Sequence, residues 1–513
     1  MKQIAYWMIC GLWIAAVPAW GASKSDSSDH PATIPNLNGA KRFELLLDED
    51  LARVVSSDDG SNASPDLMPP PFTGIQGTCP RGIPTGTINL AEAVTRALCN
   101  DPRTRQTWAE AKAQAAQVGI EQAAYLPTAN TSLNAGLDHV WQNDKAANDL
   151  GAVGSTSGNT NNASLDFTWM LFDFGQRAAA VDDAQQTLLA ATAVHDATVQ
   201  TVFLEAASAY YNLISAQNAL SIAKEVEQFN QRTLADAEAR AKQDGGMDES
   251  EKLQAQASTE QASLDRNSSE GDLLDTQGRL AILLGFAPVV KLSVDDKDVP
   301  TPDQKLAHSI DELIKQALAN HPEIRAAQAR VNAARANVDA AKRAYLPTLS
   351  LVQGNEWGRD VWGGKQWENS LALQMNIPLF NRSRHYRKRA ALAGLDSARD
   401  DVESSRQTVA LNVWTAYQSL TTQSTAIEHS KRLLATARKL LKVEQQLYRT
   451  GDGDMLDLLY AQQTVADASQ GQLDALTNWR VARLQLAASL GQLGFWTIRE
   501  TQGASTEQLP SEK

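Results

Sequence analysis

The sequence has no long apolar run beyond its first residues. After residue 21, no stretch approaches the about 18 consecutive apolar residues that a membrane-spanning helix needs. A position in a membrane would therefore require strands. Basic residues are also in deficit, with 47 Lys and Arg against 60 Asp and Glu and a net charge of -13. This balance argues against a nucleic-acid partner, because nucleic-acid binding requires a basic face.

The first 21 residues have the pattern of an export signal. Lys2 is their only charge, Ile4 to Val17 is apolar, and Ala19-Trp20-Gly21 has the small-x-small pattern of a cleavage site. Cys10 lies inside the apolar run instead of just after it, so we expect no lipid anchor. The mature chain is therefore predicted to work outside the cytoplasm.

Cysteine and catalytic motifs are scarce. Only Cys79 and Cys99 remain after export, and an even pair in an oxidising compartment favours a disulfide, with two unrelated buried thiols as the alternative. The seven histidines are scattered without ligand spacing. We find no serine nucleophile elbow, phosphate loop or Cys/His metal pattern. The sequence therefore predicts no enzyme, no catalytic residue, no cofactor and no metal site.

What the sequence does contain is a duplication. Ala124-Tyr125-Leu126-Pro127-Thr128 returns as Ala344-Tyr345-Leu346-Pro347-Thr348, about 220 residues later. Further motifs recur in the same order, including Leu284-Gly285 and Leu490-Gly491. Two such halves indicate a repeated supersecondary unit and an assembly, not a catalytic pocket.

Each half begins with a helical pattern and continues into strands. We expect helices from Ile88 to Tyr125 and from Ile310 to Tyr345, each ended by a Leu-Pro pair. Alternating apolar and polar residues then predict two hairpins. Their strands are Ala129 to Trp141 and Ala163 to Leu171, joined by the loop Asn148 to Asn162, and Leu349 to Trp357 and Trp367 to Leu379, joined by Gly358 to Gly364.

One apolar face, one polar face and aromatic residues near the strand ends are typical of outer-membrane barrel strands. On this interpretation Leu165, Phe167, Leu371 and Leu373 face lipid. The alternative is a soluble hairpin with one face on a core. Four strands cannot close a pore, so several copies would share one barrel, and three copies would supply twelve strands.

Very long helices follow the hairpins. Gln176 to Asp244 and Arg382 to Thr450 each contain roughly 69 residues, or about 100 Å. Glycines then reverse the chain into return helices of about 38 residues that end near Gly285 and Gly491. We expect the first return helix to stack end to end on the helix 310–345 and the second on the helix 88–125. The combined length of each pair matches the length of one long helix.

This order of elements resembles the TolC-like outer-membrane channels of bacterial efflux and type I secretion. The Ala-Tyr-Leu-Pro-Thr motifs and the segment Tyr448-Arg449-Thr450-Gly451 through Met455 to Gln462 carry the resemblance, which covers roughly residues 86–496. Asn100-Asp101-Pro102-Arg103-Thr104-Arg105 and the paired cysteines look more like the branch that secretes toxins or proteins than the drug-efflux branch.

The resemblance implies a mixed fold, all-α plus membrane β-barrel. A homotrimer would form a twelve-stranded barrel in outer-membrane lipid, continued into the periplasm by an α-helical coiled-coil tunnel. Its partners would be a periplasmic adaptor (membrane fusion protein) and an inner-membrane ABC or proton-driven transporter. Cargo would pass through a passive exit duct. The rival hypothesis is a periplasmic coiled-coil adaptor or scaffold.

The resemblance also implies residues of a periplasmic aperture. The family's aspartate ring falls on Asp457, its second ring falls on Tyr460, and a gate-locking basic residue falls on Gly453. Asp452 and Asp454 lie beside the same reversal, where turn and N-cap roles explain them equally well. Three carboxylates that face one narrow axis would repel each other and favour cations.

A basic run opens the second long helix: Arg382, Arg384, Arg387, Lys388 and Arg389. It faces either the phosphates of the inner leaflet or plain solvent, and the sequence leaves both open. The predicted organisation is a signal peptide (1–21), an irregular segment (22–86), a first repeat (87–288), a linker (289–309), a second repeat (310–496) and a flexible tail (497–513).

Overall fold

The computed structural model describes residues 79–80, 82–84, 86–142, 154–243, 249–294, 309–359 and 364–493. All of them belong to one compact unit. The predicted signal peptide 1–21, the tail 497–513 and the predicted irregular segment up to residue 78 lie outside the described residues.

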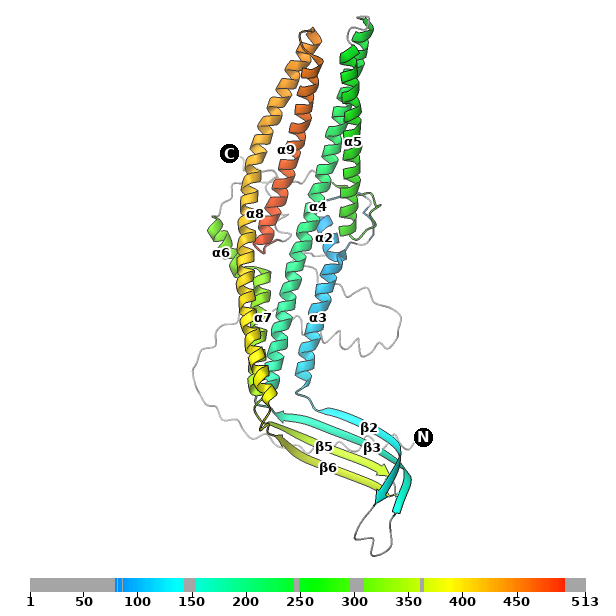
Figure 1. Ribbon diagram of the computed structural model, residues 1–513, viewed down its shortest axis with the longest axis vertical. Helices are drawn as coiled ribbons and strands as arrows, with labels where there is room; N and C mark the ends of the chain where they lie inside the picture. The colour runs from blue at the N-terminus through cyan, green and yellow to red at the C-terminus, as the bar shows by residue number, and fades with distance from the viewer. Residues whose placement is uncertain are drawn as a thin grey trace, which may run out of the picture. The chain divides into compact units, whose positions relative to one another are not determined.

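The described elements occur twice in the same order (Figure 1). The first set is α2 (Leu90–Asn100), α3 (Pro102–Ala123), β2 (Thr128–Gln142), β3 (Gly154–Phe172), α4 (Gln176–Gln243) and α5 (Glu249–Leu283). The second set is α6 (Ile310–Asn320), α7 (Pro322–Arg343), β5 (Thr348–Arg359), β6 (Lys365–Asn376), α8 (Arg382–Thr450) and α9 (Met455–Ser489). A short parallel pair, β1 (Thr87–Ile88) and β4 (Ser293–Val294), is also present. The duplication and the two very long helices are confirmed over the described residues.

The prediction of one continuous helix before each hairpin is wrong. Each of these helices breaks at the residue before a proline, where Asp101 and His321 have extended backbone with ψ of 127° and 132°. A proline ring disfavours α-helical backbone in the residue that precedes it. Both residues then serve as N-caps, because Asp101 accepts a hydrogen bond from the Arg103 N–H and His321 accepts one from the Glu323 N–H.

The predicted loop from Asn148 to Asn162 is wrong over its second half. β3 begins at Gly154 and pairs with β2 in continuous antiparallel register, for example Asn159 with Leu137 and Asn162 with Asn134. Residues 148–153 lie outside the described residues. The Gly, Asn and Ser residues of this stretch have weak strand propensity, so the ladder to β2 determines their conformation.

Helix α4 lies inside the helical layer (Figure 1). It packs against α3 and α7 near the sheet and against α5 and α9 further along, while α8 packs against α7 and then α9. Arg325 pairs with Asp196 across α7 and α4 at 3.0 Å, and Arg266 pairs with Glu227 across α5 and α4 at 2.9 Å. The helices therefore have the order α3, α4, α7, α8 near the sheet and α5, α4, α9, α8 toward the hairpin tips.

The predicted stacking partners of the short helices are wrong. The end of α5 meets the start of α3 in its own repeat, because Asn100 Nδ2 donates to the Leu284 carbonyl at 2.7 Å. The end of α9 likewise meets the start of α7, where a Cβ on Gly491 would lie 2.9 Å from Pro322 Cδ. Each return helix thus continues the helix that precedes the hairpin of the same repeat, α3 or α7, since its terminal glycine, with φ of 83° or 70°, brings the chain close to that helix.

His321 connects these two stacked helices of the second repeat. Its Nδ1 accepts from the Glu323 N–H at 3.3 Å, and its ring also hydrogen-bonds the Ala488 carbonyl of α9. Burial lowers the pKa of His321, which favours the neutral ring that can accept at one nitrogen and donate at the other.

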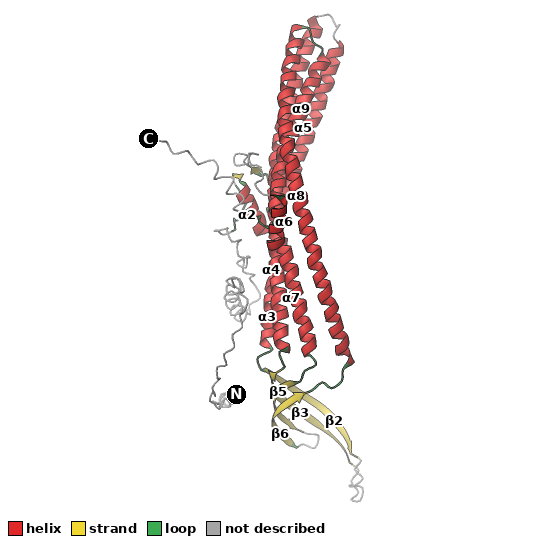
Figure 2. Cartoon of the chain, turned by 90° about the vertical axis from the view of Figure 1, so that its left-hand side faces the viewer, coloured by secondary structure: helices red, strands yellow, loops and turns green. Residues whose placement is uncertain are grey.

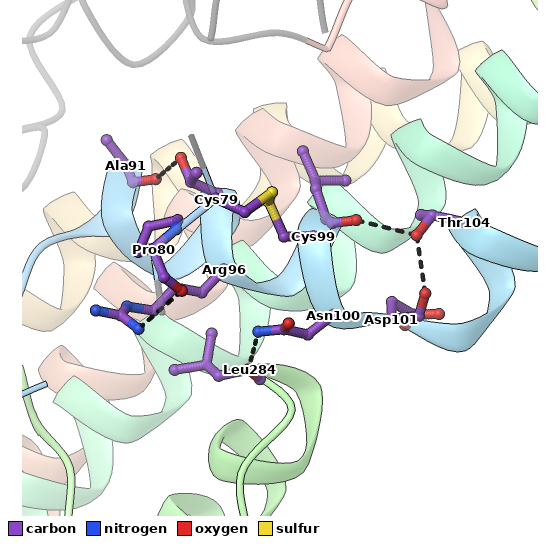
Figure 3. The surroundings of a disulfide bond; sticks show 11 residues. Cys79, Pro80, Ala91, Arg96, Cys99, Asn100, Asp101, Thr104 and Leu284 are labelled. Carbon is purple, nitrogen blue, oxygen red and sulfur yellow. Dashed lines mark hydrogen bonds between the residues drawn. A yellow bond between two sulfur atoms is a disulfide. The ribbon is translucent and has the colours of Figure 1, made fainter. Parts of the chain in front are cut away.

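A disulfide joins Cys79 to Cys99, with their Cα atoms 6.0 Å apart (Figure 3). It attaches the segment before β1 to α2. Arg96 of α2 strengthens the attachment, because its Nη1 donates to the Gly82 carbonyl at 2.8 Å. The segment therefore has a covalent and a hydrogen-bonded link to the helical layer.

We expect the mature protein, denatured without reductant, to take up no alkylating label at Cys79 or Cys99 and to take up two labels after reduction. Mass spectrometry of the intact chain measures this difference. Labelling of both thiols without reductant would contradict the disulfide. Closing a loop of this size stabilises a folded chain by roughly 3 kcal/mol, so a Cys79→Ser, Cys99→Ser variant should unfold at lower denaturant concentration.

Among the described residues, no helix combines the length and apolar character that crossing a membrane demands.

Candidate channel sites at the two ends of the helices

The four long strands form one sheet in the order β2-β3-β5-β6, at the end of α3, α4, α7 and α8 (Figure 2). All three pairings are antiparallel. β2 and β6 are the outer strands, and neither pairs on its other side among the described residues. Open edges of this length are ready to pair with strands of another chain.

The register brings apolar residues of different strands onto one face. Ala129, Phe167, Gln353 and Leu371 lie side by side across the four strands, as do Trp169, Leu351 and Leu373 across three. Leu165 lies two residues from Phe167 and so shares its face. The four residues predicted to face lipid, Leu165, Phe167, Leu371 and Leu373, therefore share one face of the sheet.

This apolar face is largely uncovered. Leu137 is 85% exposed, Leu371 69% and Leu373 66%. An exposed apolar surface of this extent marks a region that contacts lipid or protein.

The opposite face is polar. Asn130, Asp166, Gly354 and Ser370 lie side by side across the four strands, and the next row places Glu356 beside Glu368. Asn162 Nδ2 donates to Glu356 Oε1 at 2.7 Å on this face. One face is thus suited to lipid and the other to water.

A register shift changes the last apolar position of β3. The alternation predicts Leu171 on the apolar face, but the pairing skips from Met170–Ser350 to Phe172–Leu349. The extra residue of a bulge makes Phe172 the partner of Leu349.

The far end of α8 contains the second predicted site. Gly451 ends the helix with φ of 83°, a backbone conformation that favours glycine. Asp454 caps α9, because its side chain accepts from the Leu456 N–H at 3.2 Å, and Asp452 Oδ2 accepts from Thr450 Oγ1 at 2.9 Å. Both carboxylates therefore stabilise the turn.

Asp457 differs from these two aspartates. It is exposed in the first turn of α9, and no side chain in the described part of the chain forms an ion pair with it. Tyr460, one turn further on, is 71% exposed. An unpaired carboxylate on an exposed helix start is available to a pore axis in an assembly.

Gly453 stands where the resemblance places a basic residue, and the structure has no room for a side chain at this position. A Cβ on this residue would lie 2.9 Å from both Leu447 Cβ and the Tyr448 nitrogen. The turn itself therefore excludes a longer residue.

A cation reaches the same region from the other helical hairpin. Arg240, near the end of α4, lies with its guanidinium carbon 4.0 Å from the centre of the Tyr448 ring, and its Nη2 donates to the Tyr448 carbonyl at 2.9 Å. The Tyr448 hydroxyl donates to Glu251 Oε2 of α5 at 3.3 Å. We call these three residues the tip contact.

Burial raises the pKa of Tyr448 to about 12, so its hydroxyl stays protonated and can donate to Glu251. Apolar packing surrounds the tip contact, since Tyr448 is buried with Ala237, Ala255, Met455 and Leu458. The tip contact therefore joins the α4–α5 hairpin to the α8–α9 hairpin. The sequence motif that contains Tyr448 did not reveal Arg240 and Glu251, because these two residues lie 208 and 197 positions away from Tyr448 in the chain.

No cluster of metal-ligating side chains occurs within the described ranges. The two ends of the helices indicate a class of protein instead: a wall segment of a channel, with a two-faced sheet at one end and helical hairpin tips at the other. The family model of outer membrane efflux proteins matches residues 93–286 and 313–492, so the chain belongs to that family.

Relatives and solved structures agree with this assignment. The chain is 30% identical over 417 residues to Protein CyaE of Bordetella pertussis, covering 80% of this chain and 85% of that protein. It is 21% identical to Outer membrane protein TolC of Escherichia coli, covering 79% and 82%. The MtrE outer membrane channel of Neisseria gonorrhoeae, in its open state, has the same fold with a TM-score of 0.64 at 21% identity, covering 78% and 88%.

The protein is thus an outer-membrane export channel that extends into the periplasm, and it is not an enzyme. The interpretation as a periplasmic scaffold is not favoured.

Proposed function

We propose that three copies of the chain assemble into one passive duct. The observation that supports this most directly is that the sheet and the helical layer end in different elements on their two sides. β2, α3 and α5 form one side and β6 and α8 form the other. Contacts between unlike sides of identical chains produce a closed ring when the rotation from one copy to the next divides a full turn evenly. Three four-stranded sheets then make twelve strands.

Exposed apolar rows on both sides support the same assembly. On α8, Leu433, Leu440 and Leu447 repeat at spacing seven, and Leu433 is 55% exposed. On α5, Leu264 is 62% and Ile282 61% exposed. A row at heptad spacing requires a helical neighbour, and α5 of the next copy provides one.

In this assembly the apolar face of the sheet contacts lipid and the polar face lines water. The hairpin tips converge at the periplasmic end, where three copies of Asp457 ring the axis. Asp452 and Asp454 belong to the same rim, in addition to their roles in the turn.

Purified trimers should form ion-conducting channels in planar bilayers, which tests the proposed duct. We expect Leu371→Arg and Leu373→Arg to prevent assembly, because a lipid-facing arginine near mid-membrane costs roughly 2 to 4 kcal/mol. Ser370→Arg and Gln374→Arg are matched controls, since they lie one residue away on the polar face. Heat-modifiable migration on SDS gels and bilayer conductance measure the outcome. Equal tolerance on both faces would refute the lipid-facing assignment.

We infer that the periplasmic end docks to an adaptor and to an inner-membrane transporter, either an ABC pump or a proton-driven one. The family resemblance supports these partners, and a duct with no catalytic group needs an external energy source. The cargo is either a secreted protein or a small molecule. Deleting the gene and comparing secreted protein with drug susceptibility would separate the two, because only one should change.

A further inference from the structure

The contact between α7 and α8 changes character toward the sheet. Further from the sheet it is apolar, with Val331 and Val338 of α7 packed with Leu395 and Val402 of α8, and Ala391 beside them. Counting back seven residues from Leu395 and from Ala391 gives Lys388 and Arg384. The helix face that packs on α7 therefore becomes basic in its first two turns.

The opposing residues at the end of α7, including its C-cap Ala344, are small. Ala340, Ala341 and Ala344 line a cavity of about 570 Å³ together with Arg384 and Arg387 of α8. Gln176 and Asn337 add amide groups to the same cavity. The cavity thus combines two guanidinium groups, two amides and an alanine wall, and its volume is within the range of small-molecule sites.

The charges of this region have no ion-pair partner among the described residues. Arg382, Arg384, Arg387, Lys388 and Arg389 fall within the first eight residues of α8, and none forms an ion pair in the part of the chain that the structure describes. The first turn of α8 contains no acidic residue. Cations are unfavourable at a helix N-terminus because the helix dipole is positive there, so an external anion would relieve this arrangement.

The location indicates which class of anion would bind there. β6 ends at Asn376, and between it and the basic run lie Leu379 and Phe380, which are 92% and 89% exposed. The basic residues follow within about 12 Å along the helix. Exposed apolar residues followed at once by cations are typical of a membrane surface, where anionic headgroups attract basic segments.

We propose that the cavity between α7 and α8 binds the phosphate group of a membrane lipid, with Arg384 and Arg387 as its ligands. The planar guanidinium can hold two phosphate oxygens at once, while the alanines of α7 leave room for the headgroup. This inference rests on the proposed lipid-facing sheet, which places the start of α8 at the inner leaflet.

The test compares lipid retention by the full-length protein in detergent, measured by native mass spectrometry with dioleoyl phosphatidylglycerol. Dioleoylglycerol, which has the same acyl chains without phosphate, reports binding by the chains alone. We expect Arg384→Gln, Arg387→Gln to weaken phosphatidylglycerol binding by roughly 30-fold, from the loss of two cations at an anionic surface. Arg384→Lys, Arg387→Lys should retain most of the binding.

The matched control is Arg438→Gln, Lys439→Gln, which removes two exposed cations from α8 far from the sheet and should bind lipid as the wild type does. The inference would be overturned if inorganic phosphate bound the site as well as phosphatidylglycerol did. It would also be overturned if the Gln variant retained as much phosphatidylglycerol as the wild type. A Gln variant that keeps its lipid but dissociates into single chains at lower temperature would instead assign the cavity to a neighbouring copy. Wild-type channels that conduct in bilayers but do not retain phosphatidylglycerol would refute the lipid site and leave the proposed duct intact.

Discussion

Replacing Arg240 with alanine is expected to open the periplasmic end and raise single-channel conductance several-fold. The guanidinium lies 4.0 Å from the Tyr448 ring centre and donates to the Tyr448 carbonyl at 2.9 Å. A partly buried cation–π contact contributes about 1 to 2 kcal/mol and a charged hydrogen bond about 1.5 to 3 kcal/mol. In a trimer, all three copies lose the contact between Arg240 and Tyr448, so the loss of free energy that stabilises the closed tip is about three times as large.

Neighbouring substitutions separate the components of the tip contact. Tyr448→Phe keeps the ring under Arg240 and removes only the hydrogen bond to Glu251, so we expect a smaller rise in conductance. Arg232→Ala removes an exposed cation from the same helix and should leave conductance unchanged. An Arg240→Ala channel with wild-type conductance would show that the apolar packing around Tyr448 closes the tip without this cation.

Asp457→Ala is expected to abolish most of the block that multivalent cations exert from the periplasmic side. If three exposed Asp457 carboxylates converge on the axis, each pair at a separation of a few Å repels by about 1 to 4 kcal/mol, depending on the local dielectric. A di- or trivalent cation relieves this repulsion, binds the ring and blocks the pore. Single-channel recordings with such ions on the periplasmic side measure the blocking concentration and the cation selectivity.

Two controls define the role of Asp457. Glu403→Ala removes an exposed carboxylate from the first third of α8, far from the hairpin tip, and should leave the block unchanged. Asp454→Ala should lower stability by about 1 kcal/mol through the lost N-cap of α9. An unchanged blocking concentration in the Asp457→Ala channel would remove this residue from the aperture.

Local chemistry was sufficient to predict much of this protein. The long helices follow from uninterrupted helical sequence between Gln176 and Gln243 and between Arg382 and Thr450. The end of α8 follows from glycine at Gly451. Alternation in β6 predicted that Leu371 and Leu373 share a face. The helix breaks before Pro102 and Pro322 were missed, although the restriction that proline places on the preceding residue is local.

Tertiary structure decided the features that depend on distant partners. The strand from Gly154 to Asn162 forms because β2 supplies its hydrogen bonds, which its own Asn, Gly and Ser residues do not predict. The stacking of α5 on α3 depends on Asn100 meeting Leu284, 184 residues away. Arg240 and Tyr448 meet only when two helical hairpins pack together. Periodicity specifies which face of an element is apolar, whereas the partner of that face is selected by packing among elements far apart in the chain.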